Sequence, residues 1–132
     1  MEYHIKASSV ANNDAVIRIK ESSIDFGTTS KSAETLPNPA ELFLGAFASC
    51  MLKNVERFSD MMKYTYSKAT VQVDAIRLEK PPKLDAINYK LTIYSEDDKL
   101  NTVLLKKNIE KFGTIYNTVK QSCTISGTIN TI

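Results

Sequence analysis

Apolar residues are densest in the middle of the chain, over Leu36–Met62. This segment opens with residues that start helices. Asn38 can cap the first turn, Pro39 suits a first position that needs no N–H, and Glu41 falls where a capping-box carboxylate reaches back. The pattern therefore predicts a long helix that begins at this cap.

The first half of this helix is expected to be apolar on every side. Between positions 42 and 52 only Gly45 and Ser49 interrupt the apolar run, whereas later turns carry charges on one face. A helix that is apolar all round lies in a core or a subunit interface, and a membrane span needs a longer run of roughly 20 residues. The pattern predicts a buried helix with Cys50 near its centre and no membrane span.

Weak alternation of apolar and polar residues predicts strands before the helix. Positions 3–8 and 15–20 alternate around residues that suit a tight turn, which indicates an antiparallel hairpin. A short strand is expected at 24–26. Positions 27–35 are rich in Ser, Thr and Lys, which predicts a mobile loop that leads to the helix.

The chain after the helix predicts further strands and a second helix. A change of parity near Ala75 indicates a bulge, and a proline turn separates the strand that contains it from the next. The second helix is expected to begin at a Ser95 cap and to kink or break at Gly113. The strands are expected over 70–78, 87–94 and 124–131.

This order of elements predicts an α+β fold in which antiparallel sheets wrap around a long central apolar helix. We expect a single domain over residues 1–132, because this length suits one core. One small sheet does not cover so apolar a helix. We therefore expect a homodimer in which the helix is buried between the two subunits.

Composition and charge exclude several classes of protein. Hydrophobic residues make up 42% and charged residues 24%, as in ordinary globular proteins. The 17 basic and 15 acidic residues are well mixed and form no basic stripe, so nucleic-acid binding is not expected. No secretory signal is visible at the start, which predicts a cytoplasmic location.

The cysteines Cys50 and Cys123 are the main candidates for chemistry. In a reducing compartment two cysteines are more often free, catalytic or redox-sensing than joined permanently. Their separation excludes a C-x-x-C motif, and with His4 as the single histidine no metal site is expected. A cysteine among apolar residues is also often a plain core residue, so reactive and inert interpretations both stay open.

The reactive form of a cysteine is the thiolate, which forms when a cation, a base or a helix amino terminus lies nearby. Cys50 lies beyond the first helical turn, where the dipole is weak. Lys53 and Asn54 lie one turn on and Arg57 two turns on, all near its face, so a long basic side chain can reach it. Glu41 is half a revolution away and about 13 Å down the axis, so on a straight helix it does not touch Cys50.

Two segments, Asn38–Cys50 and Ser122–Ser126, resemble motifs of the OsmC/Ohr family of organic hydroperoxide reductases. In that family an Asn-Pro-x-Glu-Leu-type helix start leads to Ala-Ser-Cys in the central helix, and a second cysteine precedes the last strand. The order of elements matches over nearly the full length. The chain looks closest to a less characterised OsmC-like branch with a Pro-x-Glu-Leu helix start.

The resemblance implies an intertwined homodimer with active sites at the subunit interface. It implies that Cys50 attacks a small organic hydroperoxide in oxidative-stress defence and that Cys123 resolves the resulting sulfenic acid as a disulfide. An external dithiol of the lipoyl type restores both thiols, and no metal or bound cofactor is required. Phe43, Phe47 and Met51 are expected to favour organic hydroperoxides over hydrogen peroxide.

Two positions depart from the family pattern. Asn13 stands where the family has an activating arginine in the first hairpin, and Ala40 stands where it has a glutamate after Asn-Pro. Glu41 comes one position late, and Arg18 is the nearest amino-terminal arginine, so both are further candidates for activating the thiolate. The departures favour an alternative function, an OsmC-fold dimer that binds a small ligand or senses redox state with little peroxidase turnover.

Overall fold

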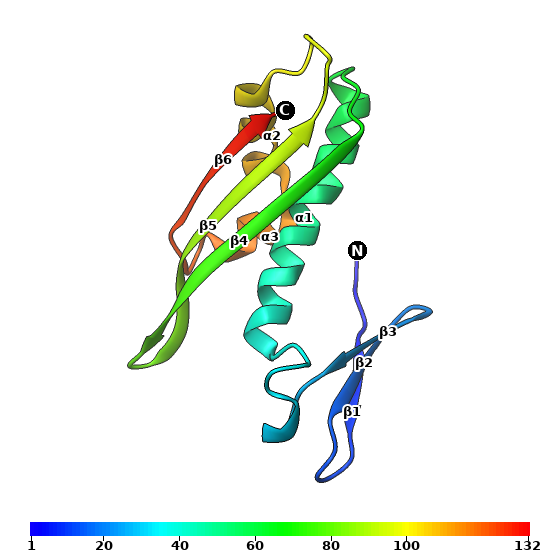
Figure 1. Ribbon diagram of the computed structural model, residues 1–132, viewed down its shortest axis with the longest axis vertical. Helices are drawn as coiled ribbons and strands as arrows, with labels where there is room; N and C mark the ends of the chain where they lie inside the picture. The colour runs from blue at the N-terminus through cyan, green and yellow to red at the C-terminus, as the bar shows by residue number, and fades with distance from the viewer. The chain divides into compact units, whose positions relative to one another are not determined.

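The structure, a computed structural model, describes residues 1–132 as two compact units, Met1–Phe43 and Leu44–Ile132. Each unit has its own three-stranded sheet (Figure 1). The α+β class expected from the sequence is confirmed. In chain order the elements are β1 (Lys6–Ser9), β2 (Ala15–Ile19), β3 (Ser22–Phe26), η1 (Ser30–Ser32), α1 (Pro39–Met61), β4 (Lys68–Glu79), β5 (Pro82–Tyr94), α2 (Thr102–Phe112), α3 (Thr114–Val119) and β6 (Ile125–Thr131).

The first unit is an antiparallel sheet in the order β1-β2-β3. Lys6 pairs with Arg18 across the first hairpin, and Ala15 pairs with Phe26 across the second. The predicted hairpin and the short strand after it are both confirmed.

One carboxylate organises the loop that follows this sheet. Asp14 Oδ1 accepts hydrogen bonds from the N–H groups of Thr28 and Thr29, at 3.0 and 3.1 Å, and from the Thr29 and Ser32 hydroxyls, at 3.0 and 2.6 Å. Ser32 is buried in the 3₁₀ turn η1. The loop expected to be mobile therefore has a fixed set of bonds, because the hairpin turn supplies an acceptor from far away in sequence.

We expect this loop to loosen in acid. The hydrogen bonds, that from Ser32 foremost, lower the pKa of Asp14 below its usual 3.8. A depressed pKa means that the stabilisation is complete above the usual value and is lost as the pH falls through the folded-state pKa. Amide exchange measured by NMR should show Thr28 and Thr29 protected, and Asp14→Ala should remove the protection even at neutral pH. The protection should survive Asp25→Ala, and its survival in Asp14→Ala would contradict the prediction.

Helix α1 begins with the reciprocal cap that the sequence predicts. Asn38 Oδ1 accepts the Glu41 N–H at 2.9 Å, and Glu41 Oε1 accepts the Asn38 N–H at 3.1 Å. Both bonds satisfy amides that the helix itself leaves without a partner. The predicted capping box is confirmed.

The second unit packs the sheet β4-β5-β6 against α1, α2 and α3 (Figure 1). In β5 the alternating residues Ile87, Tyr89, Leu91 and Ile93 are fully buried in the core, which confirms the predicted alternation. The largest fully buried side chains of this core are Tyr89, Phe47, Phe58, Met51, Ile87, Leu91, Ile93, Leu105, Ile109, Val55 and Val119.

Two features of this sheet concern its register. The ladder between β4 and β5 shifts between Asp74 and Ile76, which confirms the bulge expected near Ala75. Strand β6 runs parallel to β5, with Ile87 opposite Ile125. The prediction of purely antiparallel sheets is wrong for this pair, because α2 and α3 form a crossover that returns the chain in the same direction.

The second helix begins later than predicted. Ser95 does not cap it, because the Ser95 hydroxyl donates to the Thr65 carbonyl at 2.6 Å and accepts the Asp97 N–H at 3.1 Å. Asn101 caps α2 instead and accepts the Leu104 N–H at 3.0 Å. The prediction failed because Ser95 has a partner 30 residues away, which local sequence does not reveal.

Helix α1 buries one face within the chain. Phe47 and Met51 are 1% and 0% exposed, whereas Leu52 on another face is 37% exposed. Phe43 lies one turn before Phe47 on the same stripe and is 41% exposed. The all-round burial expected for this helix is therefore not reached within the second unit. None of the helices combines the length and apolar character needed to cross a membrane.

Candidate thiol site

Cys50 lies near the middle of α1, half-buried and with a free thiol. The Asn54 side-chain amide donates to the Cys50 carbonyl at 2.9 Å and lies 3.6 Å from the Cys50 sulfur. Asn54 is only 7% exposed, so packing holds this amide in place. An N–H donor at this position can stabilise negative charge on the sulfur.

The break between α2 and α3 lies against the same sulfur. Gly113 separates the two helices, which confirms the predicted interruption. A Cβ added to Gly113 would lie 3.4 Å from Cys50 Sγ, 3.2 Å from Tyr116 Cβ and only 2.8 Å from the Ile109 carbonyl oxygen. The Ile109 carbonyl therefore leaves no room for a side chain at the break, and the break itself lies against the Cys50 sulfur.

Phe47, one turn before Cys50 on α1, packs with two tyrosines, Tyr89 of β5 and Tyr116 of α3. The Phe47 ring centroid is 6.3 Å from that of Tyr89 and 6.1 Å from that of Tyr116. The Tyr89 hydroxyl donates to Glu110 Oε2 at 2.9 Å. Burial, with a further contribution from Glu110, raises the pKa of Tyr116 to about 12 and also raises the pKa of Tyr89. Both phenols therefore keep their protons at neutral pH.

The four residues predicted to activate the thiol have other surroundings. Arg57 places its guanidinium 5.4 Å from the Phe58 ring centroid, and Lys53 is exposed on α1. Arg18 donates to a serine hydroxyl of β3 at 3.1 Å. Glu41 belongs to the helix cap. Within the second unit neither Lys53 nor Arg57 bonds to Cys50, so an activating role for these residues stays a prediction.

Cys123 lies between α3 and β6 and is also free and half-buried. Its N–H donates to the Val119 carbonyl at 3.0 Å, and its thiol donates to the Leu84 carbonyl at 3.2 Å. Its side chain also packs against the hydrophobic core. The cysteine stands just before the last strand, as expected, and its pairing with Cys50 stays a prediction.

Three residues were predicted to line a substrate pocket, and the chain places them differently. Phe47 and Met51 face the core of the second unit, and Phe43 is exposed. A lining role for the two buried residues would need them to become accessible, and it stays a prediction.

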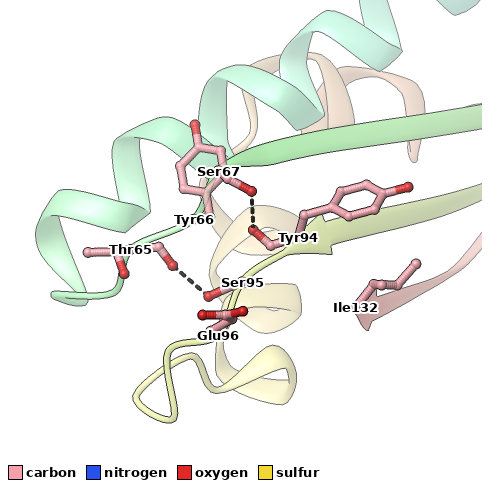
Figure 2. A pocket seen from close by; sticks show the side chains of 7 residues that line it. All are labelled: Thr65, Tyr66, Ser67, Tyr94, Ser95, Glu96 and Ile132. Carbon is pink, nitrogen blue, oxygen red and sulfur yellow. Dashed lines mark hydrogen bonds between the residues drawn. The ribbon is translucent and has the colours of Figure 1, made fainter.

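A polar groove of about 490 Å³ lies where β4 begins and β5 and β6 end (Figure 2). Two of its hydroxyls already have partners: Ser95 donates to the Thr65 carbonyl at 2.6 Å and Ser67 to the Tyr94 carbonyl at 3.2 Å, as the dashed lines show. Neither cysteine lines the groove, so it is separate from the thiol site. The lining residues are Thr65, Tyr66, Ser67, Tyr94, Ser95, Glu96 and Ile132.

Fold and site together define an α+β protein whose long helix carries one free cysteine and whose last strand follows another. The model of the OsmC-like protein family matches residues 31–131. The chain therefore belongs to the OsmC-like family, and the resemblance found in the sequence is confirmed.

Solved structures share this fold at low sequence identity. An OsmC-like protein from Mycoplasma pneumoniae is 17% identical with a TM-score of 0.88, over 100% of this chain and 98% of that one. An OsmC-like protein of unknown function from Vibrio cholerae is 11% identical with a TM-score of 0.81, over 98% and 99%. An organic hydroperoxide resistance protein OsmC from Legionella pneumophila is 13% identical with a TM-score of 0.69, over 100% and 98%. No curated protein sequence matches the chain.

Proposed function

We propose that this protein reduces organic hydroperoxides with its two thiols and acts in oxidative-stress defence. The observation that carries the proposal is the free, half-buried Cys50 sulfur beside the Asn54 amide and the Gly113 helix break. Membership of the OsmC-like family supports it. Further support comes from similar structures named for organic hydroperoxide resistance, from Legionella pneumophila and Elizabethkingia anophelis.

In the first step the Cys50 thiolate attacks the terminal oxygen of the hydroperoxide. An S–O bond forms as the O–O bond breaks, and the alkoxide leaves and takes a proton from water to become an alcohol. The sulfur loses two electrons and becomes a sulfenic acid. The Asn54 amide is placed to stabilise the thiolate before the attack.

In the second step the Cys123 thiol attacks the oxidised Cys50 sulfur. An S–S bond forms, the S–O bond breaks, and the sulfenic oxygen leaves as water with the thiol proton. An external dithiol of the lipoyl type then reduces the disulfide by two exchange reactions, which leave two protein thiols and an oxidised reductant. This cycle uses no metal and no bound cofactor.

We further propose that the protein is a homodimer. Helix α1 leaves Leu52 37% exposed, and the small side chains of Ala46 and Ser49 are exposed beside it. A second copy that covered this face would remove apolar surface from water and allow close packing of helices. Sedimentation velocity should give the mass of a dimer, and a monomer at micromolar concentration would contradict this assembly.

The activity is tested by titrating reduced protein with cumene hydroperoxide and, separately, with hydrogen peroxide. One equivalent of cumene hydroperoxide should remove both free thiols of each chain. The reaction should be faster than with hydrogen peroxide, because moving the apolar cumyl group out of water lowers the free energy. If both thiols survive excess cumene hydroperoxide, the proposed function is wrong.

One observation favours a second function, binding of a small apolar ligand or redox sensing without turnover. The side-chain donor beside the Cys50 sulfur is the neutral amide of Asn54 and not a cation. A neutral donor stabilises a thiolate less than a charged one does. Slow oxidation of Cys50 that a dithiol does not reverse would indicate this function.

A further inference from the structure

The chain around the second cysteine is fastened to the first residues of β5. Lys83 Nζ donates to the Ser122 carbonyl at 2.5 Å, and the Cys123 thiol donates to the Leu84 carbonyl at 3.2 Å. These two contacts join consecutive residues of one segment to consecutive residues of the other. They tie the segment around Cys123 to β5 and give the thiol, a weak donor, the Leu84 carbonyl as its partner.

Asp85, the next residue of β5, supplies further bonds of this fastening. One oxygen of its carboxylate accepts the Thr124 N–H at 2.8 Å, the Thr124 hydroxyl at 3.1 Å and the Ala86 N–H at 2.8 Å. Ala86 has a φ of 51°, in the left-handed region, at the bulge in the ladder. The bond from the Thr124 N–H is the foremost cause of a lowered pKa at Asp85, so the acceptor is ionised at neutral pH. Hydrogen bonds to an ionised acceptor are roughly twice as strong as neutral ones.

We propose that Asp85 is a positioning residue for Cys123, restraining the segment that carries its thiol and so raising the frequency with which the thiol meets oxidised Cys50. The inference rests on the proposed function, in which Cys123 forms the S–S bond and the sulfenic oxygen leaves as water. Without the carboxylate the segment around Cys123 loses its bonds to the Thr124 N–H and hydroxyl. The thiol then samples more directions and meets the sulfenic acid less often.

The chain offers a matched control in Asp97. One oxygen of this carboxylate accepts the Thr65 N–H at 2.8 Å and the Thr65 hydroxyl at 3.3 Å, the same pattern that Asp85 makes with Thr124. Asp97 fastens a segment that carries no cysteine. A comparison of the two positions therefore separates positioning of the thiol from a general contribution to stability.

We expect Asp85→Ala to leave the oxidation of Cys50 unchanged and to slow disulfide formation about tenfold, because several charge-assisted bonds are lost. Single-turnover reaction with cumene hydroperoxide, quenched with a 1,3-diketone that traps sulfenic acid, measures both steps. Asp85→Asn keeps an acceptor oxygen and should recover a rate within about threefold of the unmodified protein. Asp97→Ala should match the unmodified protein.

Two outcomes of that experiment would overturn the proposal. One is disulfide formation in Asp85→Ala as fast as in the unmodified protein. The other is an equal slowing of both steps, which would show a general structural role. If Asp85→Ala does not fold, Thr124→Val removes only the hydroxyl bond and should slow disulfide formation about threefold. An unchanged rate in that variant would overturn the proposal equally.

A second measurement does not depend on peroxide chemistry. In Cys50→Ser protein Cys123 is the only thiol, and its alkylation by iodoacetamide reports how firmly it is held. Adding Asp85→Ala should speed alkylation about tenfold by releasing the thiol from its carbonyl partner, whereas Asp97→Ala should not. If the unmodified protein does not react with hydroperoxides but Asp85→Ala still speeds alkylation and Asp97→Ala does not, the proposed function is wrong and the restraint of Cys123 by Asp85 stands. If the difference is absent, the positioning role is wrong.

Discussion

Cys50→Ser is expected to abolish the reduction of cumene hydroperoxide, with a loss of about a thousandfold or more, because a serine hydroxyl is not ionised at neutral pH and cannot replace a thiolate nucleophile. The measurement is consumption of hydroperoxide in the presence of a dithiol. The half-buried Cys50 sulfur has the Asn54 amide on one side and the Gly113 helix break on another, and no other thiol shares these surroundings.

Cys123→Ser is the matched variant, because it removes the other free thiol and leaves the surroundings of Cys50 intact. It should consume one equivalent of hydroperoxide and stop at the sulfenic acid, which a 1,3-diketone traps and mass spectrometry places on Cys50. Retained activity in Cys50→Ser would contradict the assignment. Sulfenic acid found on Cys123 in Cys50→Ser would show that Cys123 is the attacking cysteine and Cys50 the resolving one.

Gly127→Ala is expected to destabilise the protein by about 3 kcal/mol, because overpacking a rigid core forces side chains and backbone apart. A Cβ at this position of β6 would lie 2.1 to 2.3 Å from three atoms of the Tyr89 ring. Tyr89 is fully buried, and its hydroxyl bonds to Glu110, so the ring cannot move away without loss of both packing and that bond.

Urea unfolding followed by circular dichroism measures this effect. Thr128→Ala, the next residue of β6 and an exposed one, is the control and should change the free energy of unfolding by less than about 0.5 kcal/mol. Equal stability of Gly127→Ala and the unmodified protein would show that the Tyr89 ring is not held as described.

Local rules predicted those parts of the fold whose contacts are close in sequence. The reciprocal bonds between Asn38 and Glu41 join residues three positions apart, and a capping box depends only on that spacing. The strand alternation, the bulge near Ala75 and the break at Gly113 are likewise local. The same holds for the placement of Cys50 within a helix.

Errors arose where a side chain found a distant partner. Ser95 has the chemistry of a helix cap, yet it bonds to Thr65, and Asp97 on the same loop also bonds to that residue. Asn101 then starts α2. Helix-capping propensity does not decide between Ser95 and Asn101, because Ser95 is engaged by a residue distant in sequence.

The candidate site shows the same division. Spacing places Asn54 one turn from Cys50, but the requirement of a thiolate for a cation points to Lys53 and Arg57 and not to a neutral amide. Its burial is what gives the amide its importance, because a buried donor must find an acceptor, and burial depends on the whole core.

The sequence by itself determined the family motifs, the central helix with its cap and the presence of both cysteines. The tertiary structure alone decided the parallel pairing of β6 with β5, the fit of Gly127 against Tyr89 and the hold of Asp85 on Thr124 beside Cys123. The physical reason is one of distance. Caps and periodicity act within a few residues, whereas these contacts join segments tens of residues apart that meet only when the core has formed.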